Sequence, residues 1–74
     1  AFDAANNMYV VSRWQHVVKV YNTDFEQIAI SGNNNSAGGQ AGKLDEPIGI
    51  NIDNNKVYIT EKGNHRISIF TAFN

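Results

Sequence analysis

Residues 47–70 read PIGINIDNNKVYITEKGNHRISIF, and the spacing of apolar side chains along this stretch decides the fold class. Between residues 47 and 53, isoleucine alternates with other residues, which is the period of a β-strand with one buried face. Two more strands are predicted over 56–61 and 66–70, because asparagine and glycine runs that favour tight turns precede each of them. Gly49 indicates a close approach of another backbone to the first strand. We expect one apolar layer from these strands, formed by Ile48, Ile50, Ile52, Val57, Ile59, Ile67 and Ile69.

The upstream half of the chain has the same pattern. Isoleucine and valine together occur fourteen times and leucine once, and β-branched side chains favour strands over helices. Strands are predicted over 8–12, 17–21 and 25–30, with residues 1–3 ending another strand. Four glycines and three consecutive asparagines within residues 32–43 predict a long loop. The sequence therefore predicts an all-β protein.

Composition excludes several functional classes. The 74 residues include no cysteine, six basic and seven acidic side chains, for a formal net charge of −1. There can be no disulfide or thiolate zinc site, and two histidines are too few for an all-histidine metal site. The charge balance argues against a basic nucleic-acid arm or a polybasic membrane tag. No apolar run reaches the length of a membrane span, and we expect no cofactor.

An internal repeat indicates the architecture. A shift of 49 positions overlays the chain on itself, so that Tyr9 meets Tyr58, His16 meets His65 and Arg13 meets Lys62. Repeats of 20–50 residues are typical of solenoids and propellers, in which one unit cannot bury its apolar face alone. Antiparallel strands in units of about this length favour a blade of four strands in a β-propeller. The other equivalent pairs are Asn6 with Asn55, Met8 with Val57, Val10 with Ile59, Val18 with Ile67, Val20 with Ile69 and Tyr21 with Phe70.

The second unit resembles the NHL repeat in three segments: residues 39–50, 57–61 and 63–70. That family is named for an Asn-His-Leu segment, which is Asn64-His65-Arg66 here. Residues 9–17 of the first unit resemble the family more weakly. The resemblance implies a β-propeller, most often six-bladed.

This resemblance also implies a division of the chain. Residues 1–31 are expected to form a partial first blade, 32–46 an inter-blade loop and 47–74 a partial second blade. Two blades cannot close a ring, since propellers contain roughly four to eight. The remaining blades are expected from a longer chain or from identical copies, and three copies would give a six-bladed homotrimer.

Two sets of residues are candidates for special roles. In the resembling family, the segment Asn64, His65 and Arg66 organises a turn, and its arginine commonly reaches an acidic group, for which Glu61 is the candidate. Alternating strand directions place two turns and the long loop on a common rim. Trp14 lies in one of these turns, where an exposed aromatic suits stacking on a sugar, a peptide or a base. The alternative is that Trp14 packs on a neighbouring blade. The candidate ligand-binding residues on this rim are Arg13, Trp14, Gln15, His16 and Lys62.

No catalytic residue is predicted, because the sequence lacks a cysteine nucleophile, a phosphate-binding glycine loop and a metalloprotease motif. The leading hypothesis is a non-enzymatic propeller segment that binds a protein or glycan. Single-stranded RNA binding is an alternative that the net charge of −1 disfavours. A lyase or hydrolase is another, since propeller enzymes that resemble this family, such as the peptidyl-amidoglycolate lyase, hold metal ligands at the channel.

Asn34 begins a possible N-glycosylation sequon. The sequence does not indicate a compartment.

Overall fold

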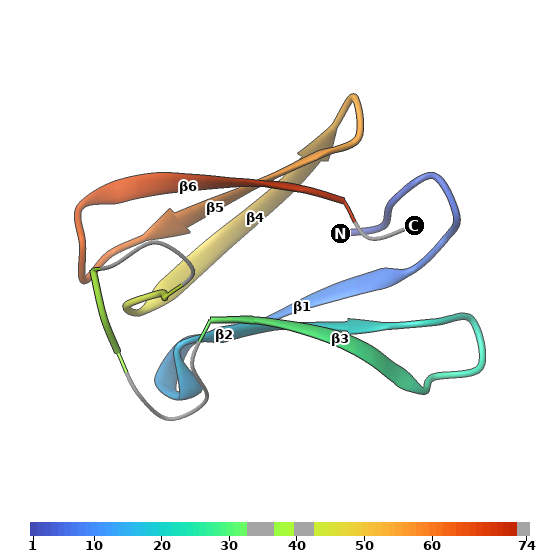
Figure 1. The fold of residues 1–74 in the computed structure, drawn as a ribbon, viewed down its shortest axis with the longest axis horizontal. Coiled ribbons are helices and arrows are strands. Elements are labelled where there is room, and N and C mark those ends of the chain that lie inside the picture. The colour runs from blue at the N-terminus through green and yellow to red at the C-terminus, as the bar shows by residue number, and fades with distance from the viewer. Residues whose placement is uncertain (33–36, 40–42, 73–74) are drawn as a thin grey trace.

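Two antiparallel sheets of three strands each make up the computed structural model (Figure 1), which describes residues 1–32, 37–39 and 43–72. A short 3-10 turn, η1 (Arg13–Gln15), joins the first two strands. Neighbouring strands in each sheet are also consecutive in sequence. The first sheet contains β1 (Met8–Ser12), β2 (Val17–Tyr21) and β3 (Gln27–Gly32), and the second contains β4 (Pro47–Asp53), β5 (Lys56–Glu61) and β6 (Arg66–Thr71).

The all-β prediction is confirmed, and the differences from the predicted strands have local causes. The strand expected over residues 1–3 is a single bridge between Phe2 and Met8. β3 starts two residues later than predicted, at Gln27. The Oδ1 atom of Asn22 accepts hydrogen bonds from the backbone N–H groups of residues 24 and 26, and Phe25 is left-handed with φ 62°. These bonds close the chain into a turn, so the strand cannot begin until the turn is complete.

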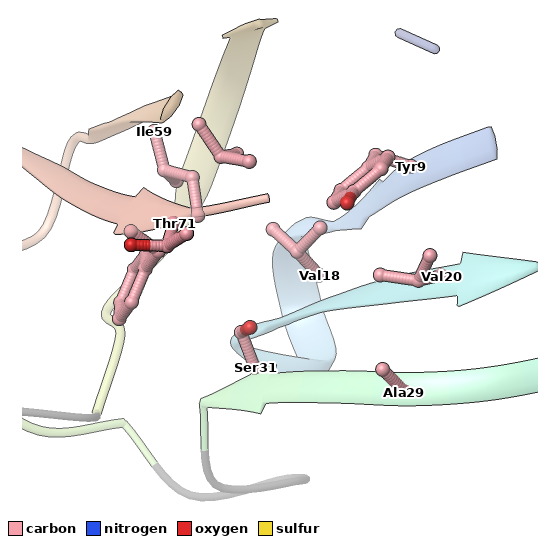
Figure 2. Close-up of a pocket in the computed structure, with 9 residues that line it drawn as sticks. Tyr9, Val18, Val20, Ala29, Ser31, Ile59 and Thr71 are labelled. Carbon is pink, nitrogen blue, oxygen red and sulfur yellow. The ribbon is translucent and has the colours of Figure 1, made fainter. Parts of the chain in front are cut away.

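The core lies between the two sheets. Tyr9, Val18 and Val20 of the first sheet face Ile59 of the second sheet, and all four are buried (Figure 2). The sheets diverge from this contact (Figure 1) and leave a cavity of about 140 Å³ between them. Leu44, which precedes β4, is fully buried in the same cluster. The apolar contact between the sheets is therefore confined to one small layer.

The single apolar layer predicted for the second sheet is wrong. An irregularity in the β4–β5 pairing between Pro47 and Gly49 interrupts the alternation at Ile48, which is 50% exposed. Ile67 and Ile69 are 61% and 57% exposed, because Val57 and Ile59 pair with Phe70 and Ser68 on the buried face. The isoleucines of this sheet are therefore divided between two faces, and one face is open.

The close approach predicted at Gly49 is also wrong, since a Cβ there would lie 3.7 Å from the Thr60 side chain, an ordinary contact. The tight positions are instead Gly32 and Gly63. A Cβ on Gly32 would lie 2.4 Å from the His16 carbonyl oxygen, and one on Gly63 would lie 2.2 Å from Asp45 Cγ. Gly32 is the last residue of β3, where the connection between the sheets begins. Gly63 lies in the turn between β5 and β6, against Asp45 of that connection.

The two turns that the repeat predicts to be equivalent have the same backbone geometry. The His16 N–H donates to the Arg13 carbonyl over 3.2 Å, and the His65 N–H donates to the Lys62 carbonyl over 3.3 Å. Both histidines are left-handed, with φ values of 60° and 50°. The repeat is therefore visible in local geometry as well as in sequence.

No helix in the described part of the chain is long and apolar enough to cross a membrane.

Candidate functional site

One end of the molecule gathers the turn between β1 and β2, the turn between β5 and β6 and the described residues of the β3–β4 connection (Figure 1). On this rim, η1 leaves the Trp14 side chain 70% exposed. The Arg13 guanidinium carbon lies 4.4 Å from the centroid of the Trp14 ring, within the range of a cation–π interaction. This pair combines an exposed aromatic surface with a positive charge.

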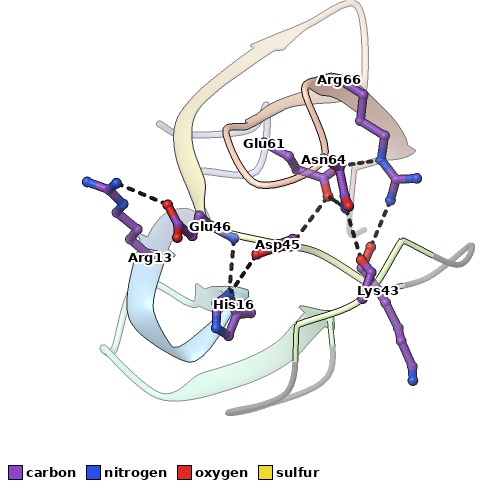
Figure 3. A network of polar contacts seen from close by, with 9 residues as sticks. Arg13, His16, Lys43, Asp45, Glu46, Glu61, Asn64 and Arg66 are labelled. Atoms are coloured by element: carbon purple, nitrogen blue, oxygen red, sulfur yellow. Dashed lines mark hydrogen bonds and ion pairs between the residues drawn. The ribbon is translucent and has the colours of Figure 1, made fainter.

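Two other bonds tie η1 and the turn after it to the segment that precedes β4 (Figure 3). Arg13 Nη2 lies 3.0 Å from Glu46 Oε2, and the Glu46 backbone N–H donates to His16 Nδ1 over 3.1 Å. Asp45 Oδ1 lies 3.7 Å from the same histidine nitrogen. Arg13 and His16 therefore hold the start of the second sheet against the first.

The remaining predicted rim residues differ in their surroundings. Gln15 Oε1 accepts a hydrogen bond from the Ser12 hydroxyl over 2.7 Å. The backbone N–H of Lys62 donates to the Glu46 carbonyl over 3.0 Å. Among the residues that the structure describes, the Lys62 ammonium forms no hydrogen bond or ion pair. The structure thus leaves Trp14 and the Lys62 side chain as the most available groups of the predicted set.

Glu61 is the centre of a second polar cluster (Figure 3), and its side chain is fully buried. Arg66 Nε donates to Glu61 Oε2 over 2.8 Å, which is the contact that the family resemblance implied. Asn64 Nδ2 donates to Oε1 over 2.7 Å, the Ser68 hydroxyl donates to Oε2, and the Asp45 N–H donates to Oε1 over 3.1 Å. A single carboxylate therefore joins β5, β6 and the inter-sheet connection.

This cluster determines the charge state of Glu61. Burial raises the pKa of Glu61, but hydrogen bonds from Arg66, Ser68, Asn64 and the Asp45 amide outweigh burial and lower the pKa below its ordinary value. The carboxylate is therefore ionised and saturated with donors. It stabilises the turn and is not poised to transfer a proton.

Asn64 and Arg66 also fasten the connection between the sheets. Asn64 Nδ2 donates to the Gly38 carbonyl over 2.9 Å. Arg66 Nη1 and Nη2 donate to the carbonyls of Gly39 and Lys43 over 2.8 and 3.0 Å. His65, which lies between Asn64 and Arg66, has an exposed side chain. Its imidazole forms no hydrogen bond or ion pair within the described ranges.

Sequence reasoning missed three acidic residues. Asp45 and Glu46 link the two turns, and the signal that could have found them is the acid pair directly before Pro47. Asp3 is 7% exposed and accepts bonds from Asn7 Nδ2 and the Tyr9 hydroxyl, both over 3.0 Å. Burial raises the pKa of Asp3, but the bonds from Asn7, Tyr9 and the Ala5 amide outweigh burial and lower the pKa below its ordinary value. The carboxylates of Asp3 and Glu46 and the backbone of Asp45 therefore stabilise the fold through hydrogen bonds.

No group of three or more histidine, cysteine, aspartate and glutamate side chains able to hold a metal is found in residues 1–32, 37–39 and 43–72. The possible glycosylation residue, Asn34, lies outside the described residues.

Short antiparallel strands, a 49-residue repeat and two sheets that pack face to face define the class: blades of a β-propeller. The family model for the NHL repeat matches residues 44–70. The chain therefore carries an NHL repeat, which comprises the second sheet from the residues just before β4 to Phe70. Comparison with curated proteins gives no match.

Proposed function

We propose that this chain is a non-enzymatic segment of an NHL-type propeller that binds a protein or glycan through its rim. The observation that carries the proposal is Trp14, which is 70% exposed on η1 with the Arg13 guanidinium 4.4 Å from its ring centroid. An exposed tryptophan offers a flat apolar surface with a polar edge, and the adjacent cation can pair with a carboxylate or carbonyl. Sugar rings and extended peptides both present such combinations.

The proposed ligand surface consists of Arg13, Trp14, Gln15, His16 and Lys62. Within it, Trp14 supplies the stacking surface and Lys62 supplies a side chain free to contact the ligand. The contacts that Arg13 and His16 make to Glu46 orient the turn, so these two residues position Trp14. Asn64, His65 and Arg66 are assigned to the structure of the second turn.

Two alternatives are weaker. Single-stranded RNA binding calls for a basic surface, and the formal net charge is −1. A lyase or hydrolase would need a polar cluster at the propeller channel, whereas the clusters described above hold turns and connections.

The proposal includes the arrangement of the whole propeller. Residues 1–31 and 47–74 are parts of two blades that 32–46 connect. The other blades come from a longer chain or from identical copies, in which case three copies form a ring.

The solitary tryptophan provides a direct test. The folded chain is screened on glycan and peptide arrays, and each hit is titrated while the fluorescence of Trp14 is recorded. We expect saturable changes in emission, weakened binding by Trp14→Ala and partial recovery by Trp14→Phe, because Trp14 supplies the stacking surface; stacking of a base on an aromatic side chain, for comparison, contributes about 1–3 kcal/mol. Lys56→Ala, at the far end of β5, is the matched control.

Binding that Trp14→Ala leaves unchanged would contradict the proposal. Unfolding of Trp14→Ala, measured by circular dichroism, would instead show that this side chain packs on other parts of the protein.

A further inference from the structure

The groove beside the first turn is filled by the chain itself. The segment Leu44–Pro47 lies there, with Leu44 and Pro47 almost completely buried. Its acidic residue Glu46 pairs with Arg13 through the side chain and donates its N–H to His16. A Cβ on Gly32 would lie 3.2 Å from Leu44 Cδ1, which shows how closely this segment fits against the first sheet. The first turn therefore binds a segment that consists of an apolar residue, two acids and a proline.

The second turn also offers a cationic side chain and an imidazole at the repeat-equivalent positions. Lys62 stands where the first turn has Arg13, and His65 stands where it has His16, with the same left-handed backbone at both histidines. A groove runs beside this turn, lined by Ile48, Thr60, Glu61, Lys62, His65, Arg66 and Ile67.

Within the described ranges, this second groove has no occupant. Ile48 is 50% and Ile67 is 61% exposed, and no described residue forms a hydrogen bond or ion pair with the side chains of Lys62 or His65. The Glu61 carboxylate in its wall is bound by donors from Arg66, Asn64, Ser68 and the Asp45 amide. Its charge is compensated, so Lys62 and His65 determine the electrostatic character of the groove mouth.

We propose that this groove is a docking site for an extended acidic segment that opens another blade, with the order apolar residue, acid, acid and proline. The Lys62 ammonium pairs with the second acid, and a ring nitrogen of His65 accepts the backbone N–H of that residue. The apolar residue and the proline cover Ile48 and Ile67. This site shares Lys62 with the ligand surface proposed above but does not include Trp14, so the response to Trp14→Ala distinguishes the two assignments.

The test uses a fluorescent peptide with the sequence KLDEPIGINID, that of residues 43–53. Fluorescence anisotropy measures its binding to the complete 74-residue chain. We expect saturable binding, and we expect a peptide with Asn-Gln in place of Asp-Glu to bind roughly tenfold more weakly, because charge-assisted hydrogen bonds are lost.

Variants locate the site. Lys62→Ala and His65→Gly should each weaken the peptide by roughly five- to tenfold, since each removes one polar contact. Glycine retains the left-handed backbone at residue 65. Lys56→Ala and Trp14→Ala should leave the affinity unchanged. Amide chemical shifts should change over Thr60–Ile67.

Three results would overturn the proposal. These are an absence of binding at millimolar peptide, equal affinity for the acidic and amide peptides, and shift changes confined to Arg13–Glu46. The last result would show that the peptide displaces the chain's own segment from the first groove. Circular dichroism of each variant excludes loss of folding as the cause of a weakened affinity.

Discussion

Glu61 shows how a single carboxylate connects this small fold. It is 1% exposed, and it receives hydrogen bonds from the turn, from β6 and from the segment before β4. Removing one partner of a buried ion pair leaves an uncompensated group, which costs about 3–5 kcal/mol. Because Arg66 is one-third exposed and can turn to water, we expect the lower end of that range for Glu61→Gln.

The lowered pKa of Glu61 predicts how this contribution depends on pH. A carboxyl whose pKa is lower when folded stabilises the fold fully above its unfolded pKa, and the stabilisation is lost as pH falls through the folded pKa. We therefore expect Glu61→Gln to be less stable than wild type near neutral pH, with the difference shrinking below about pH 4. Urea unfolding across this range measures the difference, with the exposed Asp24→Asn as control. A difference that does not vary with pH would contradict the ion-pair explanation.

Gly63 is a second residue at which the structure sets a narrow requirement. A Cβ there would overlap the Asp45 carboxylate, which lies beside His16, while the Gly63 N–H donates to the Asp45 carbonyl over 3.1 Å. We expect Gly63→Ala to lower the free energy of unfolding by about 1–3 kcal/mol, as for other overpacked sites. Gly49→Ala is the matched control and should cost little, because its Cβ would make an ordinary contact with Thr60. Equal thermal midpoints for the two variants would show that Asp45 moves aside freely.

At the scale of elements, the strands were predictable because a half-buried strand has a period of two in its own sequence. Turns were predictable where asparagine and glycine mark them. The predictions failed at Ile48, where a pairing irregularity breaks the period, and at β3, where the Asn22 side chain closes a turn that delays the strand. The bonds of Glu46 to Arg13 and His16 span 33 and 30 residues, and no local pattern encodes such contacts.

The two faces of the second sheet predict opposite responses to truncation. Ile59 is 1% exposed between the sheets, whereas Ile67, on the other face, is 61% exposed. We expect Ile59→Ala to cost about 2–5 kcal/mol, from lost burial and the cavity left behind. In the monomeric chain, diluted below the concentration at which copies associate, Ile67→Ala should change stability by less than about 0.5 kcal/mol. Thermal unfolding followed by circular dichroism measures both. A large loss for Ile67→Ala would show that this face is already covered by another copy.

At the scale of the whole molecule, the repeat explains why two apolar faces remain open. Tyr9, Val18 and Val20 form the buried face of the first sheet, and their equivalents are Tyr58, Ile67 and Ile69 on the open face of the second. Conversely, Val57, Ile59 and Phe70 pack toward the first sheet, and their equivalents Met8, Val10 and Tyr21 lie on its outer side. The open face of the second sheet therefore has the residue pattern of the first sheet's buried face. The outer face of the first sheet likewise has the residue pattern of the second sheet's buried face.

This correspondence predicts head-to-tail association of the isolated chain. The open face of the second sheet can pack on the outer face of the first sheet of another copy, and a contact between different surfaces either closes into a ring or continues as a filament. Three copies with two blades each would give the six blades that the NHL resemblance implies.

Size-exclusion chromatography with light scattering measures the mass of the assembly, and we expect a trimer. Ile67→Lys with Ile69→Lys should give monomers that retain their β circular dichroism spectrum, because a charge at the centre of such an interface must lose its water. Lys56→Ala serves as the control and should leave the trimer intact. A wild-type chain that is folded and monomeric at high concentration would assign the missing blades to a longer polypeptide, and a mass that grows without limit would show that the head-to-tail contact does not close.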